Sequence, residues 1–248
     1  MNRFDNIDCM QGMAEYEDNH FDLIITSPPY NKGSAKRKPH KTDTWSGGNA
    51  AIKYGDYEDN MPEADYQQWQ IEFINQCLRI LKPSGSFFYN HKNRTKDRAI
   101  ISPLEWILKS NALVKQEIIW DRRMIVEVDK VRFYPKTERF YWLIKERTQP
   151  DFNGEYAQKT DIWEVLPTQG DNRHNHSAPF PLKLAEMVVL SCSQEGDTVL
   201  DPFMGSGTTA VACEKHNRYY VGFEIDKDYY DSAQKRLKQF RKQLKLAL

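Results

Sequence analysis

The sequence has few cysteines, no long apolar run and no excess of charge of either sign. The four cysteines, at positions 9, 77, 192 and 213, are scattered and include no C-x-x-C pair, which predicts reduced thiols in the cytoplasm rather than a disulfide framework. No apolar run approaches the roughly 20 residues needed to span a bilayer, and the first residues lack the apolar core of a signal peptide. We therefore expect a soluble, cytoplasmic protein with no membrane partner.

The charge balance excludes a uniformly basic coat for nucleic acid. The chain has 35 Lys and Arg residues against 35 Asp and Glu residues, so its formal net charge is zero, although a local basic patch stays compatible with that total. Its 248 residues are 40% hydrophobic and 12% aromatic, which is too apolar for a disordered chain and enough for a sizeable core. With no internal repeat or low-complexity tract, we expect a single domain over residues 1–248.

Apolar runs bounded by turn residues alternate with segments of helical periodicity along most of the chain. Buried strands are predicted at residues 21–26, 86–90, 113–120, 140–144, 198–201 and 219–224. Helices are predicted at residues 64–81, 208–215 and from 229 onward, the first stopping at the turn sequence 82–85. This alternation predicts an α/β fold with a mostly parallel sheet covered by helices on both faces.

Two segments break the alternation and are candidate insertions that read a substrate. Residues 31–62 are polar, lysine-rich and long for a loop in a compact domain, so the segment is either functional or disordered. Residues 121–170 interleave charged and aromatic side chains. The basic run at 235–245 differs from both, because its apolar residues recur at helical spacing, and we expect an amphipathic helix with a solvated face.

A glycine-rich turn, DPFMGSGT at Asp201–Thr208, links the strand at 198–201 to the next helix. Glycines accept positive φ and let a ligand approach the backbone, and the helix N-terminus offers unpaired N–H groups. Glu224 ends the following strand, where an acidic side chain can accept hydrogen bonds from ribose hydroxyls. Neither the dinucleotide motif G-x-G-x-x-G nor the G-K-S/T of a P-loop is present. The unit predicts a nucleoside site, the alternative being a tight turn without a ligand.

A second turn, Ser27-Pro28-Pro29-Tyr30, follows the first strong strand. Prolines fix φ and remove N–H donors, so the turn is rigid and presents carbonyl oxygens. Ser27 Oγ and the Pro28 carbonyl can accept hydrogen bonds while Tyr30 offers a planar face. The arrangement suits a flat base that carries an amino group. A proline-rich surface turn with a packed tyrosine is the alternative.

The two turns together resemble the motifs of S-adenosylmethionine-dependent DNA amino-methyltransferases, which methylate N6 of adenine or N4 of cytosine. Their catalytic motif is D/N/S-P-P-Y/F/W and their cofactor motif is F-x-G-x-G, and the catalytic motif comes first here, as in the circularly permuted beta group. Segments 4–13, 137–140 (preceded by Trp120) and 176–182 also resemble family segments, with Ser177 in place of the usual proline. The resemblance spans nearly the whole chain and implies a Rossmann-like methyltransferase fold.

The resemblance also implies a role for each motif residue. The residues implied to cradle the methionine moiety of S-adenosylmethionine are Asp201, Phe203, Gly205, Gly207 and Thr208. Glu224 is implied to hold the ribose, and Asp8 the adenine ring. The flipped target base is implied to bind at Ser27, Pro28, Pro29 and Tyr30.

The chemistry implied is mostly positioning and electrostatics. Hydrogen bonds to Ser27 and Pro28 would turn the amine lone pair out of conjugation and toward the sulfonium methyl group, and the methylated nitrogen is acidic enough to need no strong base. Serine at the first motif position leans toward N4 of cytosine over N6 of adenine. Methylation at cytosine C5 requires a Pro-Cys nucleophile, and none of the four cysteines follows a proline.

Basic residues in three places are candidate contacts to double-stranded DNA. They are Lys32, Lys36, Arg37 and Lys38 after the catalytic turn, His91 and Arg94 after the strand at 86–90, and Arg122 and Arg123 in the segment 121–170. The first group can close over phosphates and the base. A solvated, disordered loop is the alternative for that group.

Two other functions stay open at this point, a methyltransferase that acts on RNA or on protein glutamine, and an inactive DNA-binding homologue. The motif order disfavours the first, and the intact Ser27, Tyr30, Gly205 and Glu224 disfavour the second. A second copy of the chain and a cognate restriction endonuclease are further open partners. No metal site is expected, because His174 and His176 have no cysteine or acidic ligand pattern beside them.

Overall fold

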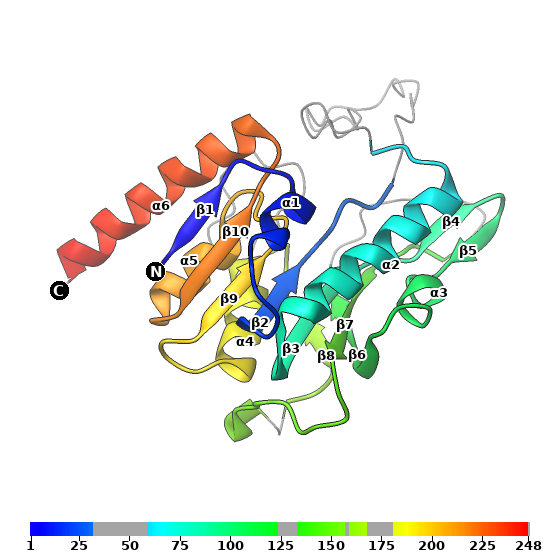
Figure 1. Ribbon diagram of the computed structural model, residues 1–248, viewed down its shortest axis with the longest axis horizontal. Helices are drawn as coiled ribbons and strands as arrows, with labels where there is room; N and C mark the ends of the chain where they lie inside the picture. Colours follow the sequence, from blue (N-terminus) through cyan, green and yellow to red (C-terminus); the bar gives the residue numbers. More distant parts are fainter. Residues whose placement is uncertain (32–58, 124–132, 157–158, 168–180, 248) are drawn as a thin grey trace.

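The computed structural model describes residues 1–31, 59–123, 133–156, 159–167 and 181–247. Within these residues, eight strands form one sheet in the order β1-β10-β9-β2-β3-β7-β6-β8 (Figure 1). They are β1 (Arg3–Asp5), β2 (Phe21–Thr26), β3 (Leu81–His91), β6 (Leu113–Asp121), β7 (Thr137–Ile144), β8 (Ile162–Glu164), β9 (Thr198–Asp201) and β10 (Tyr219–Phe223). A separate hairpin is made of β4 (Arg94–Lys96) and β5 (Ala99–Ile101).

Strand β7 is the exception in an otherwise parallel sheet. It runs antiparallel to both of its neighbours, β3 and β6, while the other neighbouring pairs are parallel. The prediction of a mostly parallel α/β sheet is thereby confirmed. Because of its direction, the amino end of β7 lies at the same edge of the sheet as the carboxyl ends of β2, β3, β9 and β10.

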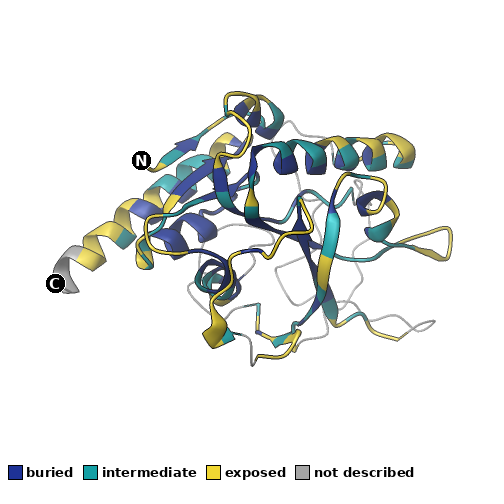
Figure 2. Ribbon diagram, turned by 60° about the horizontal axis from the view of Figure 1, so that its bottom comes forward, coloured by how far each residue is buried: buried dark blue, intermediate teal, exposed yellow. Residues whose placement is uncertain are grey.

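Helices cover both faces of the sheet, as the alternation predicted (Figure 1). One face carries α1 (Cys9–Ala14), α2 (Glu63–Ile80) and α3 (Leu104–Ile107). The other carries α4 (Leu182–Cys192), α5 (Thr208–Lys215) and α6 (Lys227–Ala247), and a short 3₁₀ turn lies at Gly154–Tyr156. In Figure 2 the buried residues follow the strands and the sides of the helices that face them.

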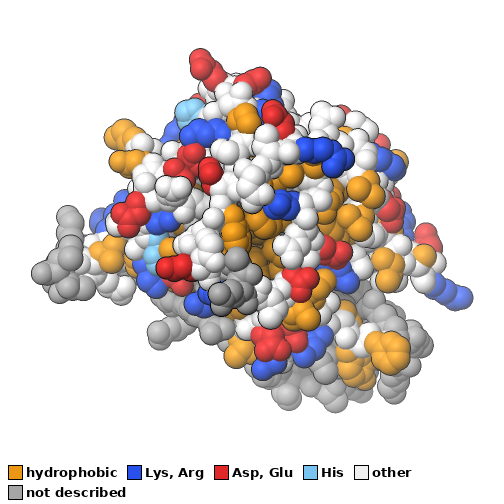
Figure 3. Space-filling model, turned by 90° about the horizontal axis from the view of Figure 1, so that it is seen from below, with side chains coloured by type: hydrophobic (Ala, Val, Ile, Leu, Met, Phe, Trp, Pro, Cys, Tyr) orange, Lys and Arg blue, Asp and Glu red, His pale blue; other side chains and the backbone are white. Residues whose placement is uncertain are grey.

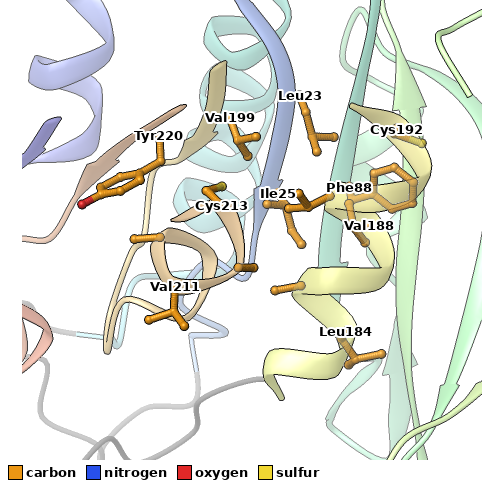
Figure 4. Close-up of a cluster of buried hydrophobic side chains, with 14 of the residues drawn as sticks. Leu23, Ile25, Phe88, Leu184, Val188, Cys192, Val199, Val211, Cys213 and Tyr220 are labelled. Carbon is orange, nitrogen blue, oxygen red and sulfur yellow. The ribbon is translucent and has the colours of Figure 1, made fainter. Parts of the chain in front are cut away.

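The side-chain alternation of β2 divides the core into two halves. Leu23 and Ile25 point to one face, where they meet Val188 of α4 and Val199 of β9 (Figure 4). Ile24 points to the other face and packs among the side chains of α1 and α2. Because both faces are covered, β2 is apolar at every position except Asp22 and Thr26, and it holds the following turn on a strand that is buried apart from Asp22.

Most predicted elements agree with the structure to within a few residues. The helix 208–215 and the strand 198–201 have the predicted bounds, and helix 64–81 is observed as Glu63–Ile80. The helix ends close to the predicted stop, but residues 82–85 form no separate turn, because β3 begins directly at Leu81. Leu81 pairs with Phe21 and Ser86 with Leu23, so the extra residues between them are accommodated as an irregularity within the strand.

Several elements were not predicted, among them β1, α1, α3, α4, β8 and the β4–β5 hairpin. The segment 121–170 was predicted as an insertion, but it contains β7, which lies inside the sheet between β3 and β6, and β8 at its edge. A target-reading role for the rest of this segment stays a prediction. Of the segment 31–62, the structure describes Asn31 and residues 59–62 only.

On the face seen in Figure 3, the described residues form no large patch of positive or of negative charge. Basic and acidic side chains alternate around a group of apolar ones on this face. The picture agrees with the zero net charge of the sequence. Among the described residues, none of the helices has an apolar stretch that would cross a bilayer.

Gly12 tests the packing of α1 on the sheet. A Cβ at this position would lie 2.5–2.7 Å from three ring atoms of the buried Phe223. We expect Gly12→Ala to lower the free energy of unfolding by about 1–3 kcal/mol, less any gain in helix propensity. Gly154→Ala is the control, since nothing lies within 4 Å of its added Cβ. Equal stability of the two variants in urea unfolding would contradict this packing.

Candidate active site

The two motifs meet where the strand order reverses direction. From β2 the chain crosses through α2 to β3, and from β9 it crosses through α5 to β10 on the opposite side, while β2 and β9 pair directly. Ligands of open α/β sheets bind outside the carboxyl ends of the strands at such a point. The turn 27–30 leaves the end of β2 and the turn 202–207 leaves the end of β9, so the structure brings the predicted catalytic and cofactor residues to one edge.

The glycine turn has the backbone conformation that its sequence predicted. Gly205 and Gly207 have φ values of 52° and 77°, in the left-handed region that glycine tolerates best. Gly207 is also the N-cap of α5, and no side chain caps that helix terminus. The first N–H groups of α5 are therefore directed toward the edge of the sheet without a side-chain partner from the cap.

Glu224 joins the glycine turn to the loop after β10. Its Oε2 accepts from the Gly205 N–H at 2.9 Å, and its Oε1 accepts from the Asp226 N–H at 2.9 Å. The side chain is nearly buried, and this burial raises the pKa of Glu224 to about 7, against the opposing effect of the two backbone hydrogen bonds. A carboxylate oxygen can accept more than one hydrogen bond, so both oxygens retain acceptor capacity.

Asp201 connects the cofactor motif to the strand that carries the catalytic motif. Its Oδ1 accepts from Thr26 Oγ at 2.8 Å and from the Phe203 N–H at 3.1 Å, and its Oδ2 accepts from Thr209 Oγ at 2.6 Å. Burial raises the pKa of Asp201 to about 6. Since Thr26 directly precedes Ser27, one carboxylate fixes both turns relative to each other.

Phe203 and Thr208 are held from behind by other elements. Phe203 packs against Phe73 and Trp69 of α2, at ring distances of 5.2 and 6.1 Å. Thr208 accepts a hydrogen bond from Arg236 of α6 at 3.0 Å, and the same Arg236 nitrogen donates to the Ser206 carbonyl at 3.0 Å. The basic run 235–245 was predicted as an amphipathic helix with a solvated face, and it lies in the helix α6, but Arg236 is on the buried side of that helix, against the glycine turn.

Asp8 lies at the start of α1 and caps it. Its Oδ1 accepts from the Met10 and Gln11 N–H groups at 2.9 and 3.1 Å. No described residue forms a hydrogen bond with Oδ2. The loop beyond β10 is close by, because Asn6 donates to the carbonyls of Glu224 and Ile225 at 2.7 and 3.0 Å.

The catalytic turn contains a cluster of polar side chains that the sequence did not predict as a group. The Tyr30 hydroxyl lies 2.9 Å from Ser27 Oγ, 2.9 Å from Asn90 Oδ1 and 3.3 Å from Glu138 Oε2. Asn90 is on β3, and Glu138 is at the amino end of the antiparallel β7. Arg122 pairs with Glu138 Oε1 at 3.1 Å. Residues from three strand ends therefore converge on one tyrosine.

The back of the same turn is supported by α2 and by His91. Tyr66 Oη lies 2.7 Å from the Pro29 carbonyl and 2.8 Å from His91 Nε2. The His91 ring packs on Tyr30 with 4.4 Å between ring centroids. A direct DNA contact by His91 was predicted, and this is wrong, because the imidazole is fully buried behind Tyr30.

The predicted basic DNA contacts have different surroundings. Arg94 forms a two-pronged ion pair with Glu63 at 2.7 and 2.9 Å and stacks over Tyr66, so a contact with phosphate would require it to leave these partners. Arg123 is exposed and pairs with Glu164 at 2.7 Å, whereas Arg122 is mostly covered beside Glu138. Four of the predicted contacts lie outside the described part of the chain, namely Lys32, Lys36, Arg37 and Lys38. The same holds for His174 and His176, which were considered as metal ligands.

Sequence reasoning missed four supporting residues for identifiable reasons. Asn90 and Glu138 stand at strand ends, but only the pairing of β3 with β7 brings them to Tyr30. Tyr66 follows the apolar period of α2 and therefore resembles a core residue. Arg236 lies within a basic run, and its burial depends on how α6 packs. A polar residue at the end of a predicted strand was the one usable signal.

The raised pKa of Glu224 gives a testable pH dependence of stability. Because the folded pKa of about 7 exceeds the ordinary value of 4.5, the folded state binds more protons between these pH values, and the free energy of unfolding falls as pH rises through them. We expect Glu224→Gln to reduce this fall by on the order of 3 kcal/mol between pH 4.5 and pH 8. Asp201 still titrates in the variant, so a smaller slope remains. Urea unfolding across this range checks it, and an unchanged slope would contradict it.

Comparison with known proteins agrees with the fold and with the family that the motifs resemble. Residues 21–235 match the family model of N6 and N4 methyltransferases that is described as DNA methylase. The type II methyltransferase M.BglII from Bacillus subtilis is 29% identical over 265 residues, an alignment that covers 94% of this chain and 68% of that protein.

Solved structures show the same Rossmann-like fold. The cytosine-N4-specific PvuII DNA methyltransferase superimposes with a TM-score of 0.74 at 19% identity, over 93% of this chain and 84% of that chain. The M1.HpyAVI–SAM complex gives a TM-score of 0.67 at 22% identity, over 96% of this chain and 99% of that chain. The chain therefore belongs to the N6/N4 DNA methylase family and is an S-adenosylmethionine-dependent DNA amino-methyltransferase.

Proposed function

We propose that the target base binds with its amino group against Ser27 and Pro28, beside the Tyr30 ring, and that the glycine turn on the other side of Asp201 holds the cofactor. The observation that carries this proposal is the Thr26–Asp201 hydrogen bond of 2.8 Å, which joins the ends of β2 and β9. It holds the two turns on adjacent strands of one rigid sheet. The amine and the methyl donor can then meet at a fixed separation.

The residues around the glycine turn fit S-adenosylmethionine. Gly205 and Gly207 leave the turn without side chains, the uncapped N-terminus of α5 suits the carboxylate of the methionine moiety, and Glu224 retains acceptor capacity for ribose hydroxyls. The side chains of Asp201, Phe203 and Thr208 hold the same turn in place through their own contacts. For Asp8 we propose a contact of Oδ2 with the adenine amino group, while Oδ1 continues to cap α1.

The chemistry places modest demands on the side chains. When bound, S-adenosylmethionine would supply an electrophilic methyl group on its sulfonium and would leave as S-adenosylhomocysteine, the electrons of the methyl–sulfur bond staying on sulfur. Ser27 Oγ and the Pro28 carbonyl accept the two N–H bonds of the amine, so that its lone pair turns out of the ring plane. As the nitrogen gains its new bond to carbon it becomes positively charged, and one of its two protons then leaves toward these acceptors and water. The base reaches the turn only after it has been flipped out of the duplex.

We propose N4 of cytosine as the methylated atom. Ser27 at the first motif position supports this choice, as does the cytosine-N4 specificity of the PvuII enzyme with the same fold. The test is incubation of duplex DNA with labelled cofactor followed by nucleoside mass spectrometry. Detection of N4-methylcytosine would support the proposal, whereas detection of N6-methyladenine would show that the target base is adenine. An absence of label, beside an active control enzyme, would contradict the function itself.

The biological setting is proposed from the relatives. M.BglII is named as a type II methyltransferase, and we propose that this enzyme likewise protects DNA from a cognate restriction endonuclease in the cytoplasm. We also propose a homodimer as its form in solution. Light scattering at several protein concentrations tests the dimer, and a monomer at every concentration would contradict it.

Tyr30→Ala tests the division of the site into two halves. We expect methyl transfer to fall by at least about 100-fold, because the variant loses both the stacking face and the hydroxyl that contacts Ser27. Cofactor affinity should stay within about threefold, since the glycine turn is held by Asp201, Glu224 and Arg236 instead. Tyr219→Ala removes an exposed tyrosine far from this edge and serves as the control. Loss of cofactor binding in Tyr30→Ala would refute the assigned role.

Arg123 tests the proposed contact to the DNA backbone. Its side chain is half exposed, and we propose that it exchanges Glu164 for a phosphate when DNA binds. We expect Arg123→Ala to weaken DNA binding and to reduce the slope of log affinity against log salt by about 1. Lys215→Ala, at the end of α5 remote from this edge, is the matched control. An unchanged slope would exclude Arg123 from the interface.

A further inference from the structure

The Tyr30 hydroxyl has more partners than it has protons. It lies within hydrogen-bond distance of Ser27 Oγ, Asn90 Oδ1 and Glu138 Oε2, at 2.9, 2.9 and 3.3 Å. A tyrosine hydroxyl donates one hydrogen bond and accepts through its lone pairs. Which neighbours receive its proton therefore decides the direction of the Ser27–Tyr30 hydrogen bond.

The orientation of Asn90 is fixed from the opposite side. Its Nδ2 donates to the Arg139 carbonyl at 3.0 Å, and the side chain is 1% exposed. The reversed amide would set its carbonyl oxygen against the Arg139 carbonyl oxygen, two acceptors without a proton between them. Asn90 therefore presents its oxygen to Tyr30 and can only accept from it.

Glu138 gives Tyr30 a second acceptor. Its other carboxylate oxygen is paired with the Arg122 guanidinium at 3.1 Å, and the oxygen that faces Tyr30 serves as an acceptor. Asn90 Oδ1 and Glu138 Oε2 can thus each accept a hydrogen bond from Tyr30, and neither can donate one to it. With the single Tyr30 proton directed toward Asn90 and Glu138, the 2.9 Å hydrogen bond between Ser27 and Tyr30 is donated by Ser27.

We propose that the Tyr30 hydroxyl, oriented by Asn90 and Glu138, fixes Ser27 as a hydrogen-bond acceptor toward the target base and so makes the site select an exocyclic amino group over an oxo group. Asn90 and Glu138 are positioning residues in this arrangement, because they act through Tyr30. With its proton committed, Ser27 Oγ offers lone pairs only. An N–H group satisfies them, whereas the oxo group of uracil or hypoxanthine faces them as a second acceptor.

The inference rests on the proposed function of Ser27, and it predicts a specific defect in Tyr30→Phe. The phenylalanine ring keeps the stacking face, but the Ser27 hydroxyl loses its acceptor and can rotate to donate to an oxo group. The measurement compares the affinities for two duplexes that differ only at the target base, cytosine against uracil (or adenine against hypoxanthine if adenine is the target), with S-adenosylhomocysteine present. The ratio of the two affinities measures the selection. Partial unfolding of the variant would lower both affinities equally and would leave their ratio unchanged.

We expect Tyr30→Phe to lower this ratio by about fivefold to tenfold, the equivalent of one hydrogen bond. In a Ser27→Ala background the same substitution should change the ratio no further, because the hydroxyl acts through Ser27. Tyr16→Phe, which removes a partly buried, hydrogen-bonded hydroxyl elsewhere, should leave the ratio at its wild-type value.

Two outcomes would overturn the inference. One is a wild-type ratio in Tyr30→Phe. The other is a drop in the ratio on Tyr30→Phe that is equally large in the wild-type protein and in the Ser27→Ala background. Failure of the proposed function is distinguishable from both, since it would appear as unimpaired methyl transfer by Ser27→Ala. The inference is supported if Ser27→Ala is impaired in methyl transfer and the effects of Ser27→Ala and Tyr30→Phe on the affinity ratio are not additive.

Discussion

The hydrogen bonds of one buried carboxylate, that of Asp201, hold the active site together. Its two oxygens join Thr26 at the end of β2, the Phe203 N–H in the glycine turn and Thr209 in α5. Burying a carboxylate is costly, as the raised pKa of Asp201 indicates, and three hydrogen bonds partly offset that cost. The result is that the strand before the catalytic turn and the glycine turn, which we propose to bind the cofactor, cannot shift independently. Everything proposed for methyl transfer depends on this fixed separation.

The antiparallel direction of β7 adds the second constraint. It brings the amino end of one strand to the carboxyl ends of its neighbours, so Glu138 joins Ser27, Tyr30 and Asn90 at one edge. With Arg122 paired to Glu138, we propose that the direction of the hydrogen bonds in this cluster is set by groups that act through Tyr30. The zero net charge of the chain fits this design, because acidic residues such as Asp201 and Glu224 are used inside the protein.

The local sequence pattern predicts the elements around the two motifs, although it missed the helix α4. The buried strand before Ser27, the glycine turn and the acidic Glu224 have spacings that a parallel sheet requires, and they are found at one edge as expected. It fails where pairing between distant segments decides the outcome. His91 follows a strand like a surface residue, yet the packing of Tyr30 and Tyr66 buries it, and Arg236 sits in a basic run but is covered by the glycine turn. Asn90 and Glu138 become partners only through the β3–β7 register.

The most direct test of the proposed site is a crystal structure with a non-reactive cofactor analogue and a duplex that contains the target base. We predict a base outside the duplex, with its exocyclic nitrogen about 3 Å from both Ser27 Oγ and the Pro28 carbonyl oxygen and the cofactor analogue on the glycine turn. A base that remains stacked in the duplex, or an amino group bound away from Ser27 while the analogue occupies the glycine turn, would contradict this prediction.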